Sequence, residues 1–469
     1  MVKVIIPLGL MFTIILLKRI PKIGGKTSVA LAAAGISALL LGGIYNPLEW
    51  LGAWLNGIDR IAWVIGLSVF GSIYSETQTE VGALETVLNM LRAKFGQSPR
   101  GLIVVIMITL AIAGSMLGDA IASATVVGVL TIGAMAALGL PGEKITGIIV
   151  IGAALGSIMP PITQAVFLSA SFLDIDPSWA VQPAYITVAI GIVFNCWFVA
   201  RFYIKKDMAL PDDLIIEKSA GKIFRERWVS LIPLFVLIFC IICRSIPGGQ
   251  ADFISGVLNT FQVQGQPFLK WLGGVPILKM FSNTIIISII LATIVAFCFK
   301  GMRGKGARCL KIGLKNIKGA TITQICIGLM LGGFYAGGTI EAIQEFAQDM
   351  GHHSLIWGGG LAMVVMGMLT GAQSAGQSAI FVFLGPTLVS MGFNPVNTAI
   401  FGSHLASAGQ CMLPVNLMCF VVAGLVSGQT GQEVNPIKSM VYCLCCGIYL
   451  LLAGMVMIYL PAWPVAAPM

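Results

Sequence analysis

Long apolar segments alternate with short polar or basic connections along almost the whole chain. Most of the apolar runs are about 16–24 residues long, which is the length of a helix that crosses a hydrocarbon core of about 30 Å. The pattern therefore predicts an all-α, polytopic membrane protein with about ten spans. These spans are expected over residues 2–17, 27–44, 61–75, 145–172, 182–203, 228–243, 282–299, 319–336, 396–427 and 439–462.

Two further apolar segments, 101–139 and 358–391, are interrupted by polar residues in their first halves. No charged loop lies at either interruption, so neither segment resembles a pair of ordinary spans. Irregular backbone at membrane depth survives only where protein or a water-filled cavity supplies hydrogen-bond partners. We predict that each segment is a re-entrant helical hairpin with a polar tip.

The two hairpins belong to an internal repeat. Gly118 lies 253 residues before Gly371, and the same interval separates other Gly and Pro positions of the two halves. Each half holds about five spans and one hairpin, and an odd number of spans turns the second half upside down relative to the first. The expected units are a first inverted repeat over residues 1–205, a cytoplasmic linker over 206–227 and a second inverted repeat over 228–469. The long segments that follow the hairpins, 145–172 and 396–427, are expected to be broken helices.

A less apolar stretch precedes each hairpin. Over residues 80–97 the apolar positions recur at i, i+3, i+4 and i+7, which is the period of a helix lying at the membrane interface. We interpret this stretch as an arm helix that links two subdomains, and an ordinary surface helix is the alternative. The corresponding stretch of the second half is 341–349.

Composition supports the membrane assignment. Hydrophobic residues make up 57% of the chain and charged residues only 10%, whereas a soluble domain carries about 25% charged residues. The eleven cysteines lie mostly inside apolar segments, with no spacing typical of a metal site or a disulfide framework.

The net charge of +9 is distributed in a way that argues against nucleic-acid binding. Most Lys and Arg residues fall in connections that alternate along the chain, as the positive-inside rule requires of cytoplasmic loops. The connections predicted to be cytoplasmic are 18–26, 76–100, 140–144, 204–227, 300–318 and 428–438. At the N-terminus the basic cluster follows the first apolar run, which is the reverse of a signal peptide, so we expect this run to be retained as a span.

Four interruptions have the composition of an ion or substrate site. Unwound carbonyls and side-chain oxygens suit Na⁺, and exposed helix N-termini suit a carboxylate. One predicted cation site comprises Ser115, Gly118, Ser157 and Thr163, with Asp119 as a further candidate ligand, and the second comprises Thr370, Ser374, Gly409 and Asn416. The substrate is expected between the two hairpin tips, in reach of Gln164, Gln373, Gln377 and Gln410. The alternative for any single interruption is that Gly and Ser merely allow close helix packing.

Asp119 is a carboxylate predicted at membrane depth. Such an acid is a functional candidate, either as a cation ligand or as a group that takes up a proton during the cycle. It is equally suited to be the N-cap of the helix that follows the hairpin tip. No Lys or Arg lies at any of the interruptions, so an anionic substrate would need helix N-termini and co-bound cations, which favours cation coupling. No catalytic motif is present, and we expect no enzyme activity; a channel is the competing class.

The motif Gly156-Ser-Ile-Met-Pro-Pro161, the paired hairpins and the position of the arm helix resemble the large membrane subunit of TRAP transporters, the DctM-like permeases of the ion transporter superfamily. This resemblance implies an elevator mechanism, Na⁺ coupling and uptake of an organic acid such as a C4-dicarboxylate across the plasma membrane of a prokaryote. It also implies two partners, a small four-span membrane subunit and an extracytoplasmic solute-binding protein. The sequence departs from the family pattern at Asp119, Ile162 and the single Pro414. A stand-alone, H⁺-coupled carrier of the lactate-permease type is therefore the alternative.

Overall fold

The computed structural model describes residues 2–17, 24, 26–205, 208–211, 218–245, 252–282, 284–342, 351–414 and 416–462. The described residues leave out part of the predicted linker 206–227, most of the basic cluster 18–26 and most of the stretch 341–349. The described chain is almost entirely helical, with one small antiparallel pair of strands, β1 (Gln262–Val263) and β2 (Gln266–Pro267).

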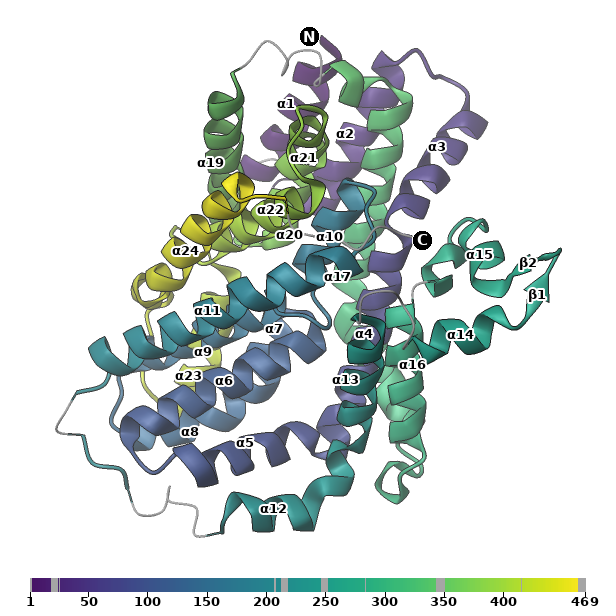
Figure 1. Cartoon of the computed structure of the whole chain (residues 1–469). Helices are drawn as coiled ribbons and strands as arrows, with labels where there is room; N and C mark the ends of the chain where they lie inside the picture. Colours follow the sequence, from purple (N-terminus) through teal and green to yellow (C-terminus); the bar gives the residue numbers. More distant parts are fainter. Residues whose placement is uncertain are drawn as a thin grey trace.

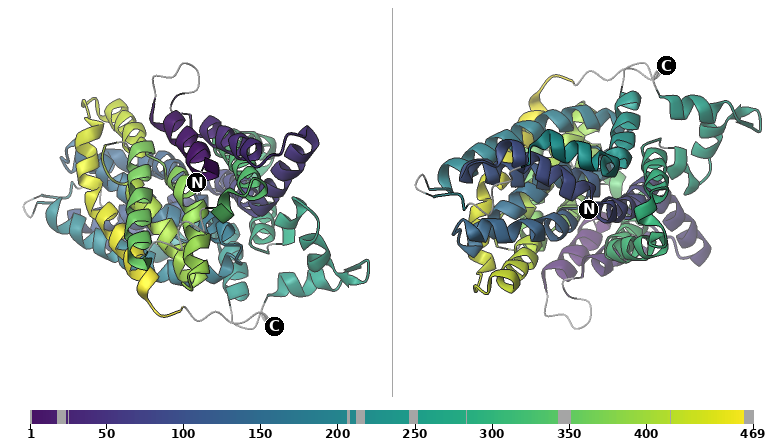
Figure 2. Two further views of the ribbon diagram at one scale, coloured as in Figure 1. Left: turned by 90° about the horizontal axis from the view of Figure 1, so that it is seen from above. Right: turned by 90° about the horizontal axis from the view of Figure 1, so that it is seen from below.

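The helices form two bundles that lie side by side in Figure 1 and in both views of Figure 2. The first, here called the α17 bundle, is built around the 31-residue helix α17, which contacts α2, α3 and α4. Its members are α1 (Val2–Leu16), α2 (Thr27–Leu41), α3 (Pro47–Arg60), α4 (Ala62–Val81), α13 (Ile232–Ser245), α16 (Thr284–Phe297) and α17 (Gly306–Ala336).

Small residues bring the backbones of the α17 bundle close together. A side-chain carbon added at Gly57 of α3 would collide with the backbone of Gly328 and Gly332 on α17. One added at Gly35 of α2 would lie 2.8 Å from the Cα of Met330. Close backbone approach of this kind is how helices associate in lipid, where burial of apolar surface contributes little.

The second bundle, here called the hairpin bundle, contains both predicted hairpins and both predicted broken helices. Its first-half members are α6 (Pro99–Leu117), α7 (Ala120–Ser123), α8 (Val129–Ala137), α9 (Gly142–Ile158), α10 (Gln164–Phe172) and α11 (Ser178–Phe202). Its second-half members are α19 (His352–Thr370), α20 (Gln373–Gly376), α21 (Val382–Ser390), α22 (Pro395–Gln410), α23 (Leu417–Thr430) and α24 (Pro436–Tyr459). The π-helical turns Ala124–Gly128 and Gln377–Phe381 lie at corresponding positions of the two hairpins.

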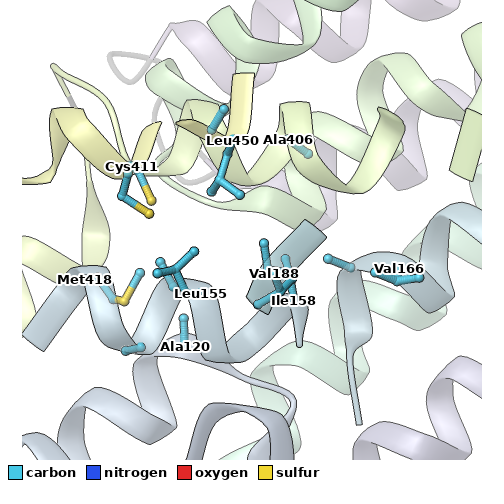
Figure 3. Packing of buried hydrophobic residues seen from close by; sticks show 14 of the residues in the cluster. Ala120, Leu155, Ile158, Val166, Val188, Ala406, Cys411, Met418 and Leu450 are labelled. Atoms are coloured by element: carbon cyan, nitrogen blue, oxygen red, sulfur yellow. The ribbon is translucent and has the colours of Figure 1, made fainter. Parts of the chain in front are cut away.

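The two halves of the chain share one core within the hairpin bundle. Figure 3 shows Leu155 and Ile158 of α9 across an apolar layer from Cys411 and Leu450, with Val188 of α11 beside them. All five side chains are buried. Since α9 also packs against α23 and α24, the first-half and second-half elements are held as one body.

The helix α5 (Ala83–Phe95) connects the bundles. It follows α4 directly after Gly82, which has φ +78°, and it packs on α6 and on α12 (Ala220–Arg227). Arg227 lies 3.0 Å from Glu85 across the α5–α12 contact, but both side chains are exposed, so this pair contributes little to stability. The helix predicted over 80–97 is present and begins at Ala83.

By length and apolar composition, five described helices are able to cross a membrane, or seven if each of two bent pairs is one span. One bent pair is α3 and α4, which meet at 58°. Residues 47–60, which lie between two predicted spans, form α3, and Asn46 caps it. Charged residues in α3 lower its hydropathy, yet Gly57 still allows close packing on α17.

Two other predicted connections contain helices. The expected cytoplasmic loop 300–318 is helical from Gly306 onward, where it forms the first part of α17. The basic side chains of this part are exposed. The connection between the spans predicted at 228–243 and 282–299 contains α14 (Phe253–Asn259), α15 (Phe268–Gly273) and a 3₁₀ turn at Leu278–Ser282. Asp59 of α3 holds this connection in place. It forms an ion pair with Lys279 at 2.8 Å and accepts a hydrogen bond from the backbone N–H of Ile277.

Candidate functional site

The first hairpin breaks at Gly118. Helix α6 ends at Leu117, Gly118 adopts φ +65°, and Asp119 is extended before α7 begins. A left-handed backbone is unfavourable for any residue with a side chain. Space is also limited, because an added Cβ would lie 2.9 Å from Cγ2 of Ile162 and 3.0 Å from its carbonyl oxygen. Both the turn and the close approach therefore require glycine.

The first broken helix lies against this tip. Helix α9 ends at Ile158 and α10 begins at Gln164, and in between the backbone N–H of Ile162 donates to the carbonyl of Ser115 at 3.0 Å. A side-chain carbon added at Gly114 would lie 2.6 Å from the Cα of Gly156. The two interruptions, distant in sequence, thus form one region of irregular backbone.

The second half repeats this geometry. Gly371 adopts φ +69° and Ala372 is extended before α20, and an added Cβ at Gly367 would lie 2.9 Å from the Cα of Gly409. The peptide bonds Pro160–Pro161 and Leu413–Pro414 are both cis. Corresponding residues are again separated by 253 positions.

The predicted cation ligands lie at these two breaks. The hydroxyls of Ser115, Ser157 and Thr370 donate to carbonyls of the preceding turn, which leaves their oxygens with free lone pairs. Thr163 Oγ1 accepts the backbone N–H of Val166, and Asn416 Oδ1 accepts that of Cys419, so both residues start the second part of a broken helix. The amide nitrogen of Asn416 is buried with no partner among the described residues.

A cavity of about 190 Å³ lies between the two hairpin tips, where the hairpin bundle meets α4 and α17. All four predicted substrate residues line it: Gln164, Gln373, Gln377 and Gln410. Asp119 and Ser374, which were predicted as cation ligands, also line it. The other predicted ligands lie at the breaks and are not among the residues that line the cavity; these are Ser115, Gly118, Ser157, Thr163, Thr370, Gly409 and Asn416.

Hydrogen bonds hold the glutamines of the second half in place. The backbone N–H of Gln373 donates to Gln410 Oε1 at 2.9 Å, and Ser407 Oγ donates to Gln373 Oε1 at 2.9 Å. Gln377 reaches across to the first half, where its Nε2 donates to the carbonyl of Ala165 at 2.6 Å and to Ser169 Oγ at 2.8 Å. The second hairpin is therefore tied to the first broken helix.

The α17 bundle contributes polar residues that the sequence reasoning missed. Thr323 and Gln324 of α17 line the cavity, as does Val64 of α4. Gln324 is buried, and its Nε2 donates to Ser68 Oγ of α4 at 2.7 Å. The sequence did contain a signal for Gln324. Placing a glutamine inside an apolar span costs free energy, so such a residue is a functional candidate.

Asp119 is an N-cap. Its Oδ1 accepts the backbone N–H of Ala122 at 2.7 Å, as the structural alternative predicted. The carboxylate also borders the cavity, so capping does not remove it from the site. The cavity residues within the described chain include no Lys, Arg or His.

Paired hairpin tips, paired helix breaks and a cavity lined by glutamines between them are the features of a membrane transport protein, because irregular backbone within apolar segments is tolerated where it lines a ligand path. The chain belongs to a family of such proteins. The sequence model of the Tripartite ATP-independent periplasmic transporter, DctM component, matches residues 28–463. The protein is therefore a multi-pass secondary transporter permease and not an enzyme.

Solved structures share the fold at low sequence identity. The YdaH transporter of Alcanivorax borkumensis superimposes with a TM-score of 0.57 at 14% identity, over 88% of this chain and 87% of that one. MtrF of Neisseria gonorrhoeae, from a class of antimetabolite efflux pumps, gives a TM-score of 0.53 at 13% identity, over 83% and 80%. Among curated proteins none matches the sequence significantly. At these identities the likeness concerns the fold alone.

Proposed function

We propose that the protein takes up a small organic acid into a prokaryotic cell, coupled to Na⁺, by movement of the hairpin bundle against the α17 bundle. The observation that carries the proposal is the cavity between the hairpin tips. Its walls come from both halves of the hairpin bundle on one side and from α4 and α17 on the other. A substrate held there would move with the hairpin bundle when that bundle shifts.

The proposed architecture has two inverted repeats, over residues 1–205 and 228–469, joined by a linker over 206–227. The paired geometry at Gly118 and Gly371 supports it. In this proposal about ten spans cross the membrane, and the hairpins at 101–139 and 358–391 enter from opposite sides. The α17 bundle is the scaffold and the hairpin bundle is the transport domain of an elevator.

The proposed Na⁺ sites lie at the two breaks. One draws on Ser115, Gly118, Ser157 and Thr163, and the other on Thr370, Ser374, Gly409 and Asn416. Irregular backbone supplies carbonyl oxygens next to these hydroxyl and amide groups, a donor set suited to a hard cation. A bound cation would also join each hairpin to its broken helix and so shape the cavity.

Membership of a tripartite family supports the proposal of two partners. One would be a small four-span membrane subunit docked on the α17 bundle, and the other an extracytoplasmic binding protein that delivers the substrate. A second candidate function is H⁺-coupled transport by this chain alone. The presence of Asp119 at the cavity favours this alternative, because a carboxylate there would exchange a proton with solvent as the site changes sides.

The direct test is uptake into proteoliposomes under imposed gradients, with a panel of labelled organic acids and with or without the two partner proteins. We expect saturable accumulation above the external concentration when an inward Na⁺ gradient is imposed, and its loss when a sodium ionophore is added. Accumulation driven only by a pH gradient would favour the second candidate. Flux that neither saturates nor accumulates would contradict both and indicate a channel.

A further inference from the structure

Two buried amide oxygens at the cavity have no partner. Gln377 is fully buried and Gln324 is 7% exposed, and both line the cavity. The Oε1 atoms of both residues find no hydrogen-bond donor among the described residues. An unpaired buried acceptor is unfavourable, so these oxygens indicate a ligand that donates hydrogen bonds.

The partners of Gln377 fix which end of its amide is the oxygen. Gln377 bonds to the carbonyl of Ala165, which only accepts, so the atom that faces it is the NH₂ group. Rotating this amide by 180° would place two acceptors against each other. In Gln324 the NH₂ group donates to Ser68 Oγ, which itself donates to the carbonyl of Val64.

Asp119 adds a carboxyl group to the same cavity, and this group carries a negative charge when it is ionised. One carboxylate oxygen caps α7, and the described cavity residues offer no basic group to balance the charge. The corresponding position of the second hairpin is Ala372. The charge is therefore not a requirement of the hairpin tip itself.

Two other glutamines offer the opposite polarity. Gln410 Oε1 accepts the backbone N–H of Gln373, and Gln373 Oε1 shares the hydroxyl of Ser407 with the carbonyl of Ser403. What these side chains have left for a ligand is their NH₂ groups. The cavity thus combines acceptors and a negative charge with donors contributed by the second hairpin and its broken helix.

We infer that the substrate is a small zwitterion, an organic acid that also carries a protonated amino group. Asp119, Gln324 and Gln377 would bind the ammonium, and the amide groups of Gln373 and Gln410 would bind the carboxylate. The cavity has about 190 Å³, against about 150 Å³ for one that holds benzene, which suits a molecule of amino-acid size. This inference rests on the proposed function and narrows its substrate class.

The test compares acids that differ only by an amino group, namely 4-aminobutyrate with butyrate, alanine with propionate, and aspartate with succinate. Binding to the purified full chain in Na⁺ buffer is measured by calorimetry. We expect each amino acid to bind at least about tenfold more tightly than its partner, a difference of about 1.4 kcal/mol. Equal or tighter binding of the acids without the amino group, or binding of none of the six, would overturn the inference.

Two variants test whether Asp119 causes the preference for acids that carry an amino group. Asp119→Asn removes the charge but keeps the cap, because Asn is as good an N-cap as Asp, and it should reduce the preference for the amino acids at least fivefold. Glu85→Gln removes a surface carboxylate paired with Arg227 and should leave the preference unchanged. An unchanged preference in folded Asp119→Asn would contradict the assigned role.

Uptake measurements distinguish failure of this inference from failure of the proposed function on which it rests. Na⁺-driven accumulation of succinate, butyrate and propionate with no preference for their amino counterparts would refute the zwitterion assignment and leave a Na⁺-coupled transporter. The absence of gradient-driven uptake for the whole panel of organic acids, these six included, with the partner proteins present, would refute the proposed function itself.

Discussion

At the scale of single residues, the account depends on glycines that allow both a left-handed turn and a close approach. Gly118 has φ +65° and faces Ile162, whereas Gly139, at the end of the same hairpin, has φ +72° with nothing within 4 Å of an added Cβ. The two positions share the backbone strain but not the contact. They therefore form a matched pair for testing whether the tip itself is needed.

We predict that Gly118→Ala lowers the rate of uptake at least tenfold, because the methyl group would push the tip away from Ile162 and the first break. Gly139→Ala should destabilise the fold by about 1–2 kcal/mol, the cost of a left-handed residue, and leave uptake close to that of the wild type. The measurements are initial uptake rates and thermal unfolding in detergent. Equal rates in the two variants would mean that the tip is only a packing feature.

At the scale of elements, each broken helix restarts at a residue that caps its second part. Thr163 starts α10 and Asn416 starts α23. The proposed Na⁺ sites use these same residues, so a change of cap should alter both the helix start and the response to Na⁺. Thr146 in α9 is a suitable control, since it is fully buried and its hydroxyl donates only to the carbonyl of Gly142.

We predict that Thr163→Val weakens stabilisation of the purified chain by Na⁺, while Thr146→Val does not. Loss of the cap should cost about 1 kcal/mol, and loss of a cation ligand should move the Na⁺ dependence of the melting temperature to roughly tenfold higher concentration. The readout is the melting temperature at a series of Na⁺ concentrations with K⁺ keeping ionic strength constant. A parallel Na⁺ dependence in both variants and the wild type would exclude Thr163 from a Na⁺ site.

The hairpin breaks were predictable from sequence because a Gly-rich polar tip inside an apolar run has few structural solutions in a membrane. The structure has helix breaks at Gly118 and Gly371, the two positions that the repeat pairs. Helix α3 was missed because Glu49, Asp59 and Arg60 make it read as a loop, although Gly57 packs it on α17. The local sequence shows only how apolar this segment is. Its contact with α17 depends on Gly328, which lies 271 residues after Gly57.

The glutamines at the cavity were chosen from sequence because they are polar residues next to breaks. Gln324 was missed because it lies in an apolar span with no break, and only the meeting of the two bundles brings it to the cavity. Its contact with Ser68, 256 residues distant in the chain, has no local signature. Asp119 was left between two roles, and the structure shows that it caps α7 and borders the cavity at once.

At the scale of the whole molecule, the proposed mechanism requires the two bundles to move against each other. Trp63 of α4 and Phe167 of α10 meet across the boundary between the bundles, with ring centroids 5.6 Å apart. Phe70 and Phe281 make an equivalent contact at 5.7 Å, but both belong to the α17 side. The two pairs allow the same chemical link to be placed across the boundary or away from it.

We predict that oxidative linking of the double variant Trp63→Cys/Phe167→Cys stops uptake, and that reduction restores it. Linking Phe70→Cys/Phe281→Cys should leave uptake unchanged, because that bond joins elements that move together. Formation of each disulfide is checked by mass mapping. Full uptake by the linked cross-boundary variant would rule out movement of one bundle against the other.

The most direct measurement of the central claim is the accessibility of the cavity from the two sides of the membrane. Ala372 lines the cavity, and Ala372→Cys in a Cys298→Ser background places a thiol there after removal of the exposed native cysteine. A membrane-impermeant thiol reagent is applied to either side of oriented vesicles, with Na⁺ or with K⁺. The account predicts labelling from one side at a time, with the accessible side changing with conditions. Labelling from both sides under one condition would indicate a channel, and no labelling from either side under any condition would mean that the cavity is not on the transport path.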